Sequence, residues 1–314
     1  MTTNTPRSLD DQYIEFVPRT AHIFRNYPQL EALRYTFFKN YVVGHKALGW
    51  KDIARHWVRP MLFRNRHTEE PIDQADVLIR VEGRRETSVD SVVRVAQELI
   101  GRGVNVKLLA SAARVAQLGV PYLEFQYPAS TTPPPWAAQA WEAFCDAYPD
   151  LRDPALQRTF DYALAKNQGL YDELNRVFDR VQPKLVILWA TQMPVGAAMA
   201  VIARERGITC LLLQHGILQP FFTPLIADYM ITWGRSSNQT LVDLGVPDDR
   251  LIPLGSPRHD SMFPQDGKEA RQQFLDALGL PDRPTLAFFS NGNDLVRNGV
   301  APLECALWLE AAAA

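Results

Sequence analysis

The chain has 314 residues, of which 46% are hydrophobic and 22% are charged, and its formal net charge is -2. This length is enough for two ordinary domains, and the composition is that of a folded globular protein. The near-neutral charge differs from the strongly basic surface of nucleic-acid-binding proteins, so we expect no nucleic-acid partner. No run of 18 apolar residues and no signal-peptide pattern is present in the sequence, which predicts a cytoplasmic protein without a membrane-spanning helix. The widely spaced Cys145, Cys210 and Cys305 favour buried free thiols in a reducing compartment.

The first 70 residues show helical patterns and not the strand–helix repeats that follow. Gln29–Tyr41 and Lys51–Phe63 carry aromatic residues at helical spacing. The second pattern interleaves arginines with apolar side chains, which suits a helix lying on the inner face of an anionic membrane. The alternative is a helix packed on the main domain, and Pro60 would break a long membrane-lying helix. We therefore predict a helical N-terminal extension over residues 1–70.

Residues 71–182 predict the first half of an α/β domain. Three apolar runs are expected to form strands: Ala75–Val81, Val104–Leu109 and Tyr122–Tyr127. A helix beginning near Ser88 separates the first two and stops at Gly101 and Gly103, because glycine adopts left-handed backbone angles at little cost. Longer helices are expected at Trp136–Tyr148 and Leu156–Val181. The stretch lacks G-x-G-x-x-G, so we expect no dinucleotide site at the first turn.

The stretch from Pro183 to Asp260 organises the rest of this domain. It contains four short apolar runs bounded by Pro and Gly: Leu185–Trp189, Ile208–Leu213, Tyr229–Trp233 and Leu251–Leu254. Such runs are typical of strands buried on both faces, and their alternation with helical patterns predicts βαβ units. The expected fold class is therefore α/β, with a parallel sheet in a Rossmann-like domain over residues 71–261. Ligands of such sheets bind at the carboxyl ends of the strands.

The residues after Asp260 predict the start of a second domain. Met262–Gly267 has the composition of an interdomain linker, and Lys268–Leu278 has a helical pattern. Thr285–Phe289 predicts a strand, followed by a glycine turn and a helix from Pro302. We expect residues 262–314 to be a linker and the beginning of a second, donor-side Rossmann-like domain in a truncated piece of a longer protein. The alternative is a short domain that closes onto the first.

The order of several short motifs resembles that of bacterial surface-carbohydrate transferases. The matching residues are Gln214-His215-Gly216, Ala227-Asp228, Trp233-Gly234, Gly245-Val246 and Gly255-Ser256-Pro257-Arg258 with Asp260. Capsule and O-antigen glycosyltransferases and the CDP-glycerol glycerophosphotransferases of wall teichoic acid are similar. The resemblance covers roughly residues 180–295 and implies the GT-B architecture of two facing Rossmann-like domains.

The resemblance implies an enzyme that moves a sugar from a nucleotide-activated donor to a surface-glycan or lipid-linked acceptor. The same motifs fit polyol-phosphate transfer and nucleotide-sugar epimerisation, and a truncated, non-catalytic glycan-binding module is a further alternative. No cofactor is expected apart from the nucleotide sugar as donor substrate. No metal is expected either, because the histidines are scattered, no D-x-D follows a predicted strand and GT-B enzymes are commonly metal-independent.

Two residues are candidates for the base that glycosyl transfer requires. His215 follows a buried strand, and histidine ordinarily titrates near neutrality, which suits proton transfer. In the glycerophosphotransferases that the motif resembles, the corresponding histidine is considered catalytic. Glu82 ends the first predicted strand and is the second candidate. The alternatives are a structural histidine bonded to a neighbouring carbonyl and a solvated glutamate in a turn.

The loops after the strands also supply the predicted acceptor contacts. Gln214 orients the loop or a ligand hydroxyl, and Gly216 lets a ligand approach the backbone. Thr191 and Gln192 follow the strand at residues 185–189. They either bind acceptor hydroxyls or cap the helix that Pro194 begins.

Two further groups are predicted to bind phosphate. Ser256 and Arg258 follow the last strand of the first domain, and an arginine there can pair with a phosphate in bidentate fashion. A salt bridge from Arg258 to Asp260 or Asp294 is the alternative. Ser290, Asn291 and Gly292 form a polar turn before a helix, which offers N–H groups to the donor diphosphate.

Overall fold

The computed structural model describes residues 8–47, 74–81, 86–110, 119–124, 132–257, 267–279 and 281–282. The chain divides into two compact units, one of residues 10–260 and one of residues 1–9 with 261–314. The domain boundaries at residues 70 and 261 stay predictions, because residues 48–73 and 258–266 lie outside the described part.

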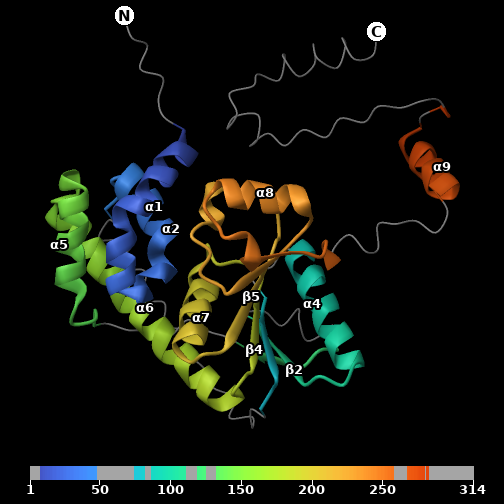
Figure 1. Ribbon diagram of the computed structural model, residues 1–314, viewed down its shortest axis with the longest axis horizontal. Coiled ribbons are helices and arrows are strands. Elements are labelled where there is room, and N and C mark those ends of the chain that lie inside the picture. Colours follow the sequence, from blue (N-terminus) through green and yellow to red (C-terminus); the bar gives the residue numbers. More distant parts are fainter. Residues whose placement is uncertain are drawn as a thin grey trace, which may run out of the picture. The chain divides into compact units, whose positions relative to one another are not determined.

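A sheet of seven parallel strands forms the centre of the larger unit (Figure 1). In spatial order the strands are β3 (Tyr122–Glu124), β2 (Val106–Ala110), β1 (Val77–Arg80), β4 (Leu185–Leu188), β5 (Thr209–Leu213), β6 (Tyr229–Thr232) and β7 (Leu251–Pro253). Every neighbouring pair is parallel. The seven apolar runs of the sequence therefore become these seven strands, and the predicted α/β fold with a parallel sheet is confirmed.

The strand order changes direction between β1 and β4. The chain runs outward from β1 to β3 and returns through α5 (Ala137–Ala147) and α6 (Pro154–Val181). It then adds β4 to β7 on the other side of β1. In register, Arg80 of β1 lies beside Leu188 of β4. Ligands of open α/β sheets bind at such a switch point, outside the carboxyl ends of the strands.

Helices cover both faces of the sheet (Figure 1). On one face α4 (Glu86–Gly101) buries Val92 and Ala96 together with Ile79 of β1. On the other face α6 and α7 (Pro194–Glu205) bury their apolar side chains together with Leu78 of β1. Leu78 and Ile79 belong to different clusters because successive strand residues point to opposite faces. Each fully buried aliphatic side chain contributes about 1.5–3 kcal/mol, so both layers stabilise the sheet strongly.

An aromatic layer joins the N-terminal segments to α5 and α6. The segments are α1 (Leu9–Asn26), the 3-10 turn η1 (Pro28–Leu33), α2 (Arg34–Phe37) and the π turn η2 (Phe38–Val43). Phe37 stacks on Phe144 of α5 with ring centroids 3.9 Å apart, and it meets Phe160 of α6 edge-on at 5.7 Å. The predicted pattern at Gln29–Tyr41 is thus helical, in three successive helix types. The helix predicted at Lys51–Phe63 lies outside the described residues.

The long helix α6 connects the aromatic layer to the sheet. Asp153 caps its N-terminus by accepting a 2.7 Å hydrogen bond from the N–H of Ala155, and its C-cap, Gln182, has a left-handed φ of 49°. Its apolar face is buried throughout: Phe160, Leu164, Leu170, Tyr171, Leu174, Val177 and Phe178. The predicted helix at Leu156–Val181 is confirmed, as is the helix at Trp136–Tyr148.

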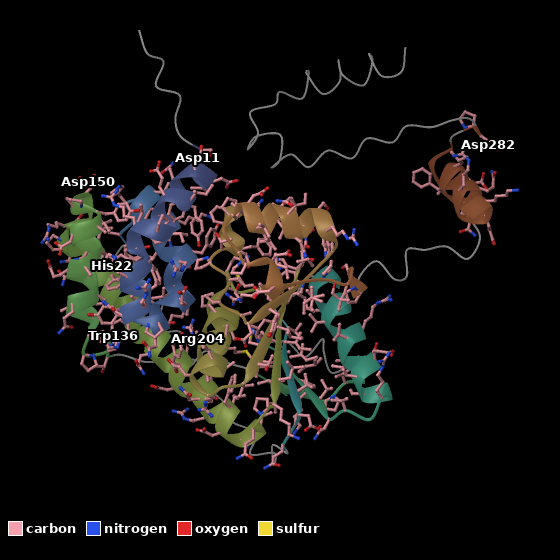
Figure 2. All side chains as sticks on the ribbon, in the orientation of Figure 1. Asp11, His22, Trp136, Asp150, Arg204 and Asp282 are labelled. Atoms are coloured by element: carbon pink, nitrogen blue, oxygen red, sulfur yellow. The ribbon has the colours of Figure 1, made fainter. Side chains whose placement is uncertain are left out.

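The remaining predictions concern α8, α9 and the cysteines. Helix α8 (Arg235–Asp243) connects β6 to β7, and α9 (Gly267–Leu278) belongs to the smaller unit and confirms the helix expected there. Cys145 and Cys210 are buried and free, as expected. Charged side chains such as Asp150 and Arg204 lie at the surface (Figure 2). The few buried polar side chains are therefore the informative ones.

Candidate functional site

Five of the predicted site residues lie at the carboxyl edge of the sheet. Thr191 follows β4, Gln214, His215 and Gly216 follow β5, and Ser256 follows β7. All these strands are parallel, so the loops that follow them lie at one edge, as the sequence predicted. Gln192, beside Thr191, lies in the same loop. The remaining predicted site residues lie outside the described part of the chain: Glu82, Arg258, Ser290, Asn291 and Gly292.

The side chain of Gln214 is buried and holds the end of β5 to the end of β6. Its Nε2 donates to the carbonyl of Gly216 at 3.0 Å, and its Oε1 accepts from the backbone N–H of Trp233 at 2.8 Å. The indole N–H of Trp233 in turn donates to the carbonyl of Gln214 at 2.9 Å. Because both ends of the amide are engaged, Gln214 fixes the turn that presents its neighbour His215.

The imidazole of His215 lies between two aromatic rings. Its centroid is 4.1 Å from that of Trp189, which follows β4, and 5.1 Å from that of Phe222. The residue is only partly buried, but its Nδ1 is shielded from solvent and has no hydrogen-bond partner. A buried polar atom without a partner is uncommon in folded proteins.

Burial lowers the pKa of His215 to about 4. The nearby backbone carbonyls of Trp189 and Leu213 act in the opposite direction and raise this pKa, but the effect of burial is larger. The expectation that this histidine titrates near neutrality is therefore wrong for the free protein. The physical reason is that the flanking rings exclude the water that would stabilise an imidazolium ion. At neutral pH the ring is uncharged, so it is a hydrogen-bonding group and only a weak base.

The space beside Gly216 is open. A methyl group built on its Cα would meet no atom within 4 Å, and its backbone is not in the left-handed region. Gly255, after β7, instead has a φ of 91°, which disfavours any side chain. Glycine is therefore required by the backbone at position 255 and not at position 216. Most of the described glycines have the same open space, so this feature alone does not mark a ligand site.

Thr191 and Gln192 are half-buried in the bend between β4 and α7. The N-cap of α7 is Met193, whose side chain makes no capping hydrogen bond. The alternative that Thr191 or Gln192 caps this helix is therefore wrong, because the N-cap position lies one residue after Gln192 and two residues after Thr191. The loop that carries them follows β4, which pairs with β1 at the switch point of the sheet.

Sequence reasoning missed Arg80, the last residue of β1. Its side chain is 3% exposed, and its Nη1 donates to the carbonyl of Leu109 at 3.1 Å. A guanidinium group is rarely buried at the carboxyl end of a central strand unless hydrogen bonds compensate for the loss of water, as the bond to Leu109 does here. The signal was present in the sequence, because an arginine interrupts the apolar run Val77–Val81.

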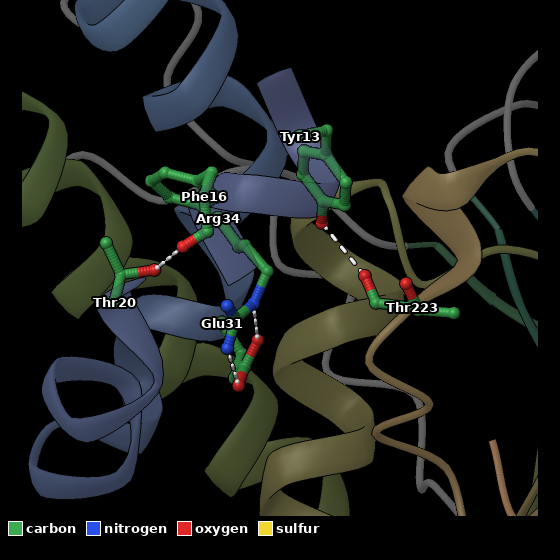
Figure 3. A network of polar contacts seen from close by, with 6 residues as sticks. All are labelled: Tyr13, Phe16, Thr20, Glu31, Arg34 and Thr223. Carbon is green, nitrogen blue, oxygen red and sulfur yellow. Dashed lines mark hydrogen bonds and ion pairs between the residues drawn. The ribbon is translucent and has the colours of Figure 1, made fainter. Parts of the chain in front are cut away.

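The N-terminal helices also contribute to the site, which the sequence did not indicate. Tyr13 of α1 donates a 3.0 Å hydrogen bond to the carbonyl of Thr223, just after Phe222 (Figure 3). Phe221 packs against Tyr13 and Tyr35, with centroids 4.8 Å away in each case. The turn η5 (Pro220–Phe222) is therefore held by the aromatic layer on one side while Phe222 contacts His215 on the other.

The same region of Figure 3 contains a buried ion pair. Arg34 donates from Nε and Nη2 to the two oxygens of Glu31, at 2.7 Å and 2.6 Å. Its guanidinium also lies 3.5 Å from the ring centroid of Phe24. Removing one member of such a pair leaves a buried charge uncompensated, so the pair holds η1 to α2, and the contact with Phe24 joins them to α1.

Asp228, which belongs to the family resemblance, and Arg250 have structural roles. The carboxylate of Asp228 accepts a 2.8 Å hydrogen bond from the backbone N–H of Cys210. Arg250 donates to the carbonyls of Leu225, Ala227 and Asp228. These contacts brace the loop that connects β5 to β6. They explain the Ala-Asp element of the resemblance without a ligand.

Among the described residues, no three His, Cys, Asp or Glu side chains gather in a way that could hold a metal ion. Nor does any helix in the described ranges have the length and apolar character needed to cross a membrane.

No family model and no curated protein sequence matches the chain. Solved structures similar to it include two UDP-GlcNAc 2-epimerases. The enzyme from Neisseria meningitidis, bound to UDP-GlcNAc, is 12% identical to this chain, with a TM-score of 0.39. The match covers 65% of this chain and 53% of the enzyme. The enzyme from Rickettsia bellii is 17% identical to this chain, with a TM-score of 0.35. The match covers 66% of this chain and 52% of the enzyme. This chain thus spans about half the length of either epimerase, and its own reaction is a matter for proposal and test.

Proposed function

We propose that the larger unit is the acceptor-side domain of a glycosyltransferase that uses a nucleotide-activated sugar. The observation that carries the proposal is the position of His215 at the carboxyl edge of the sheet. There its neutral imidazole lies beside the open space at Gly216 and one strand away from the switch point. The order of the motifs around it, which resembles that of surface-carbohydrate transferases, supports the same reaction class.

In this proposal His215 accepts the proton of the acceptor hydroxyl while the sugar moves from the donor phosphate to the acceptor oxygen. An imidazole with a pKa of about 4 is too weak a base to do this efficiently in the free protein. A bound diphosphate would favour the imidazolium ion and raise its pKa. Proton acceptance is therefore coupled to donor binding, which restricts the reaction to the complete complex.

The acceptor side of the proposal involves Thr191, Gln192 and Gly216, and Gln214 positions the loop. Glu82, Ser256, Arg258 and the turn at residues 290–292 complete the proposed set of base and phosphate contacts. A lipid-linked acceptor would place the reaction at the inner face of a membrane. No cofactor is proposed apart from the donor itself.

The direct test offers the protein a pool of nucleotide sugars together with CDP-glycerol, with and without a lipid-linked acceptor. Products are identified by mass spectrometry. We expect a sugar to be transferred only when acceptor is present. Consumption of CDP-glycerol alone would assign polyol-phosphate transfer, and a changed sugar formed without acceptor would assign epimerisation. Consumption of no activated donor would contradict every enzymatic reading.

A further inference from the structure

We infer that a cavity between the N-terminal segments and α6 is a second ligand site, and that it takes an uncharged saccharide through Thr36, Asn40 and Tyr41. The cavity has a volume of about 620 Å³. Small-molecule sites in proteins usually occupy about 300–1,000 Å³, so the space is large enough for a monosaccharide or a disaccharide. None of the described residues assigned above to the site at the sheet edge lines this cavity, so the two sites are separate.

The hydroxyl of Tyr41 is the clearest pointer to a ligand. Tyr41 lines the cavity and is 4% exposed, yet its hydroxyl is not fully shielded and has no hydrogen-bond partner among the described residues. The ring itself is held by protein: it stacks on Phe37 with centroids 4.9 Å apart and meets Phe160 edge-on at 6.3 Å. Because the rest of the residue is covered, the small surface that it exposes includes the hydroxyl, which a ligand in the cavity can reach. Unpaired polar groups on buried side chains are uncommon.

Two more uncharged polar side chains line the same cavity. Thr36 and Asn40 are half-buried, and neither side chain makes a hydrogen bond to any described residue. Thr36 belongs to α2, whereas Asn40 and Tyr41 belong to the π turn η2. Residues four apart on a helix share a face, and the i→i+5 spacing of a π turn brings residue 41 to that face as well. The π turn therefore explains how two consecutive side chains reach one cavity, and such turns are frequent at functional sites.

Apolar side chains form much of the rest of the lining. Ala163 and Leu170 lie seven residues apart on one face of α6, and Leu33 and Pro194 add further aliphatic surface. Asn167 also lines the cavity, but its Oδ1 is fully shielded and its Nδ2 donates to a backbone carbonyl of η1 at 2.9 Å. Asn167 is therefore part of the wall and not a ligand contact. A mostly apolar lining with a few polar side chains is the usual make-up of a small-molecule site.

The three polar side chains determine the class of ligand. Burial, and to a smaller extent Asp161, raises the pKa of Tyr41, so its hydroxyl keeps its proton and can donate. Asn40 offers both donors and an acceptor, and the hydroxyl of Thr36 can act in either way. The hydroxyls of a sugar ring match such groups, and the C–H face of the same ring fits aliphatic surface.

Other ligand classes fit this lining less well. An alkyl chain would remove water from Thr36, Asn40 and Tyr41 without replacing their hydrogen bonds, which is costly. An anion would find no cation among these three, since the lysines that line the cavity, Lys46 and Lys166, are exposed and can keep their charged ends in water. None of the described lining residues is an aspartate or a glutamate, so a cationic ligand would find no carboxylate there. An uncharged saccharide avoids each of these costs.

The test measures binding to the full chain by isothermal titration, without any nucleotide sugar. The probes are the methyl glycosides of glucose, galactose, mannose and N-acetylglucosamine, together with uridine as a planar ligand and hexanol as an alkyl ligand. We expect at least one glycoside to bind saturably with a Kd of about 1 mM or tighter. It should bind at least about tenfold more tightly than uridine or hexanol.

Variants that remove single hydroxyls locate the binding. Tyr41→Phe and Thr36→Val should each weaken it by about three- to tenfold, because each removes one hydrogen-bonding group and keeps the bulk of the side chain. Neither hydroxyl bonds to a described residue, so both variants should fold, and thermal unfolding checks this. Tyr35→Phe is the matched control, because it removes a tyrosine hydroxyl from α2 without touching the cavity. It should change the affinity by less than about twofold.

Two results would overturn the inference. One is that none of the glycosides binds more tightly than uridine and hexanol do. The other is that the folded Tyr41→Phe and Thr36→Val proteins bind the tightest glycoside as well as the unchanged protein does. Neither result bears on the nucleotide-sugar proposal, because the titrations contain no donor and use no activity.

Discussion

At the scale of single residues, His215 couples the stability of the fold to pH. Burial lowers its pKa from 6.5 to about 4, so the unfolded chain takes up this proton at a higher pH than the folded one. The stabilising effect is complete above pH 6.5 and is lost as the pH falls from 6.5 toward 4. From this group alone we predict a loss of about 3 kcal/mol of unfolding free energy across that window.

Urea unfolding of His215→Gln measures this contribution, because glutamine stays neutral throughout. The free energy of unfolding of the variant should fall less steeply than that of the unchanged protein between pH 7 and about pH 4.5. His22→Gln, at an exposed position of α1, is the matched control and should follow the unchanged protein. Parallel curves for His215→Gln and the unchanged protein would show that the ring is not held in its neutral form.

Gly216 and Gly255 give a second residue-scale prediction. Gly216→Ala should keep or slightly raise the stability, by up to about 1 kcal/mol, because the backbone is unstrained and the added methyl meets open space. Gly255→Ala should lower it by about 1 kcal/mol or more, because a φ of 91° is strained for alanine. If a ligand approaches Gly216, the stable Gly216→Ala protein should nevertheless lose affinity for the donor or acceptor. Full affinity in that variant would remove Gly216 from the site.

At the scale of elements, α1 supports the turn that covers His215. The hydroxyl of Tyr13 donates to the carbonyl of Thr223 at 3.0 Å, and Phe222 contacts the imidazole. We predict that Tyr13→Phe lowers the stability by about 1–3 kcal/mol, since it leaves a carbonyl in a buried setting without its donor. Hydrogen exchange of residues 216–224 should become faster. Tyr35→Phe is the control, because the Tyr35 ring contacts the same Phe221 and its hydroxyl makes no hydrogen bond to the described residues. Equal exchange in both variants would contradict a supporting role for α1.

The strands were predictable and the N-terminal helices much less so. A short run such as Leu185–Leu188 between Pro and a polar bend carries its own signal, because a strand buried on both faces needs apolar residues throughout. Helix α1 falls within the extension predicted to be helical, but its bounds were not predicted, because Pro18 lies inside it and its buried face includes Thr20 among the aromatics. The segment from Pro28 to Val43 passes through three helix types, and no single period describes it.

The site shows the same division between local and tertiary information. The position of His215 followed from a local rule, since it directly follows a buried strand of a parallel sheet. Its lowered pKa depends on Trp189 and Phe222, which approach it only in the fold. The role of Gln214 likewise depends on Trp233, which lies on the neighbouring strand's loop. Sequence spacing therefore located the residues but did not determine their chemistry.

At the scale of the whole molecule, the sheet and the aromatic layer form one unit of residues 10–260 that presents His215 at its carboxyl edge. Helices on both faces bury the strands, and the N-terminal segments hold the turn beside the imidazole. The proposed reaction therefore depends on long-range packing as well as on the loops at the sheet edge.

The most direct test of this account compares kcat/KM for sugar transfer from a nucleotide-sugar donor between the unchanged protein and His215→Gln at pH 7. A group that accepts the proton in the transition state contributes about 10²–10⁴-fold, so we predict a loss of that size. His22→Gln should keep the full rate. Unchanged kcat/KM in a folded His215→Gln protein would contradict the central claim that this imidazole takes part in the reaction.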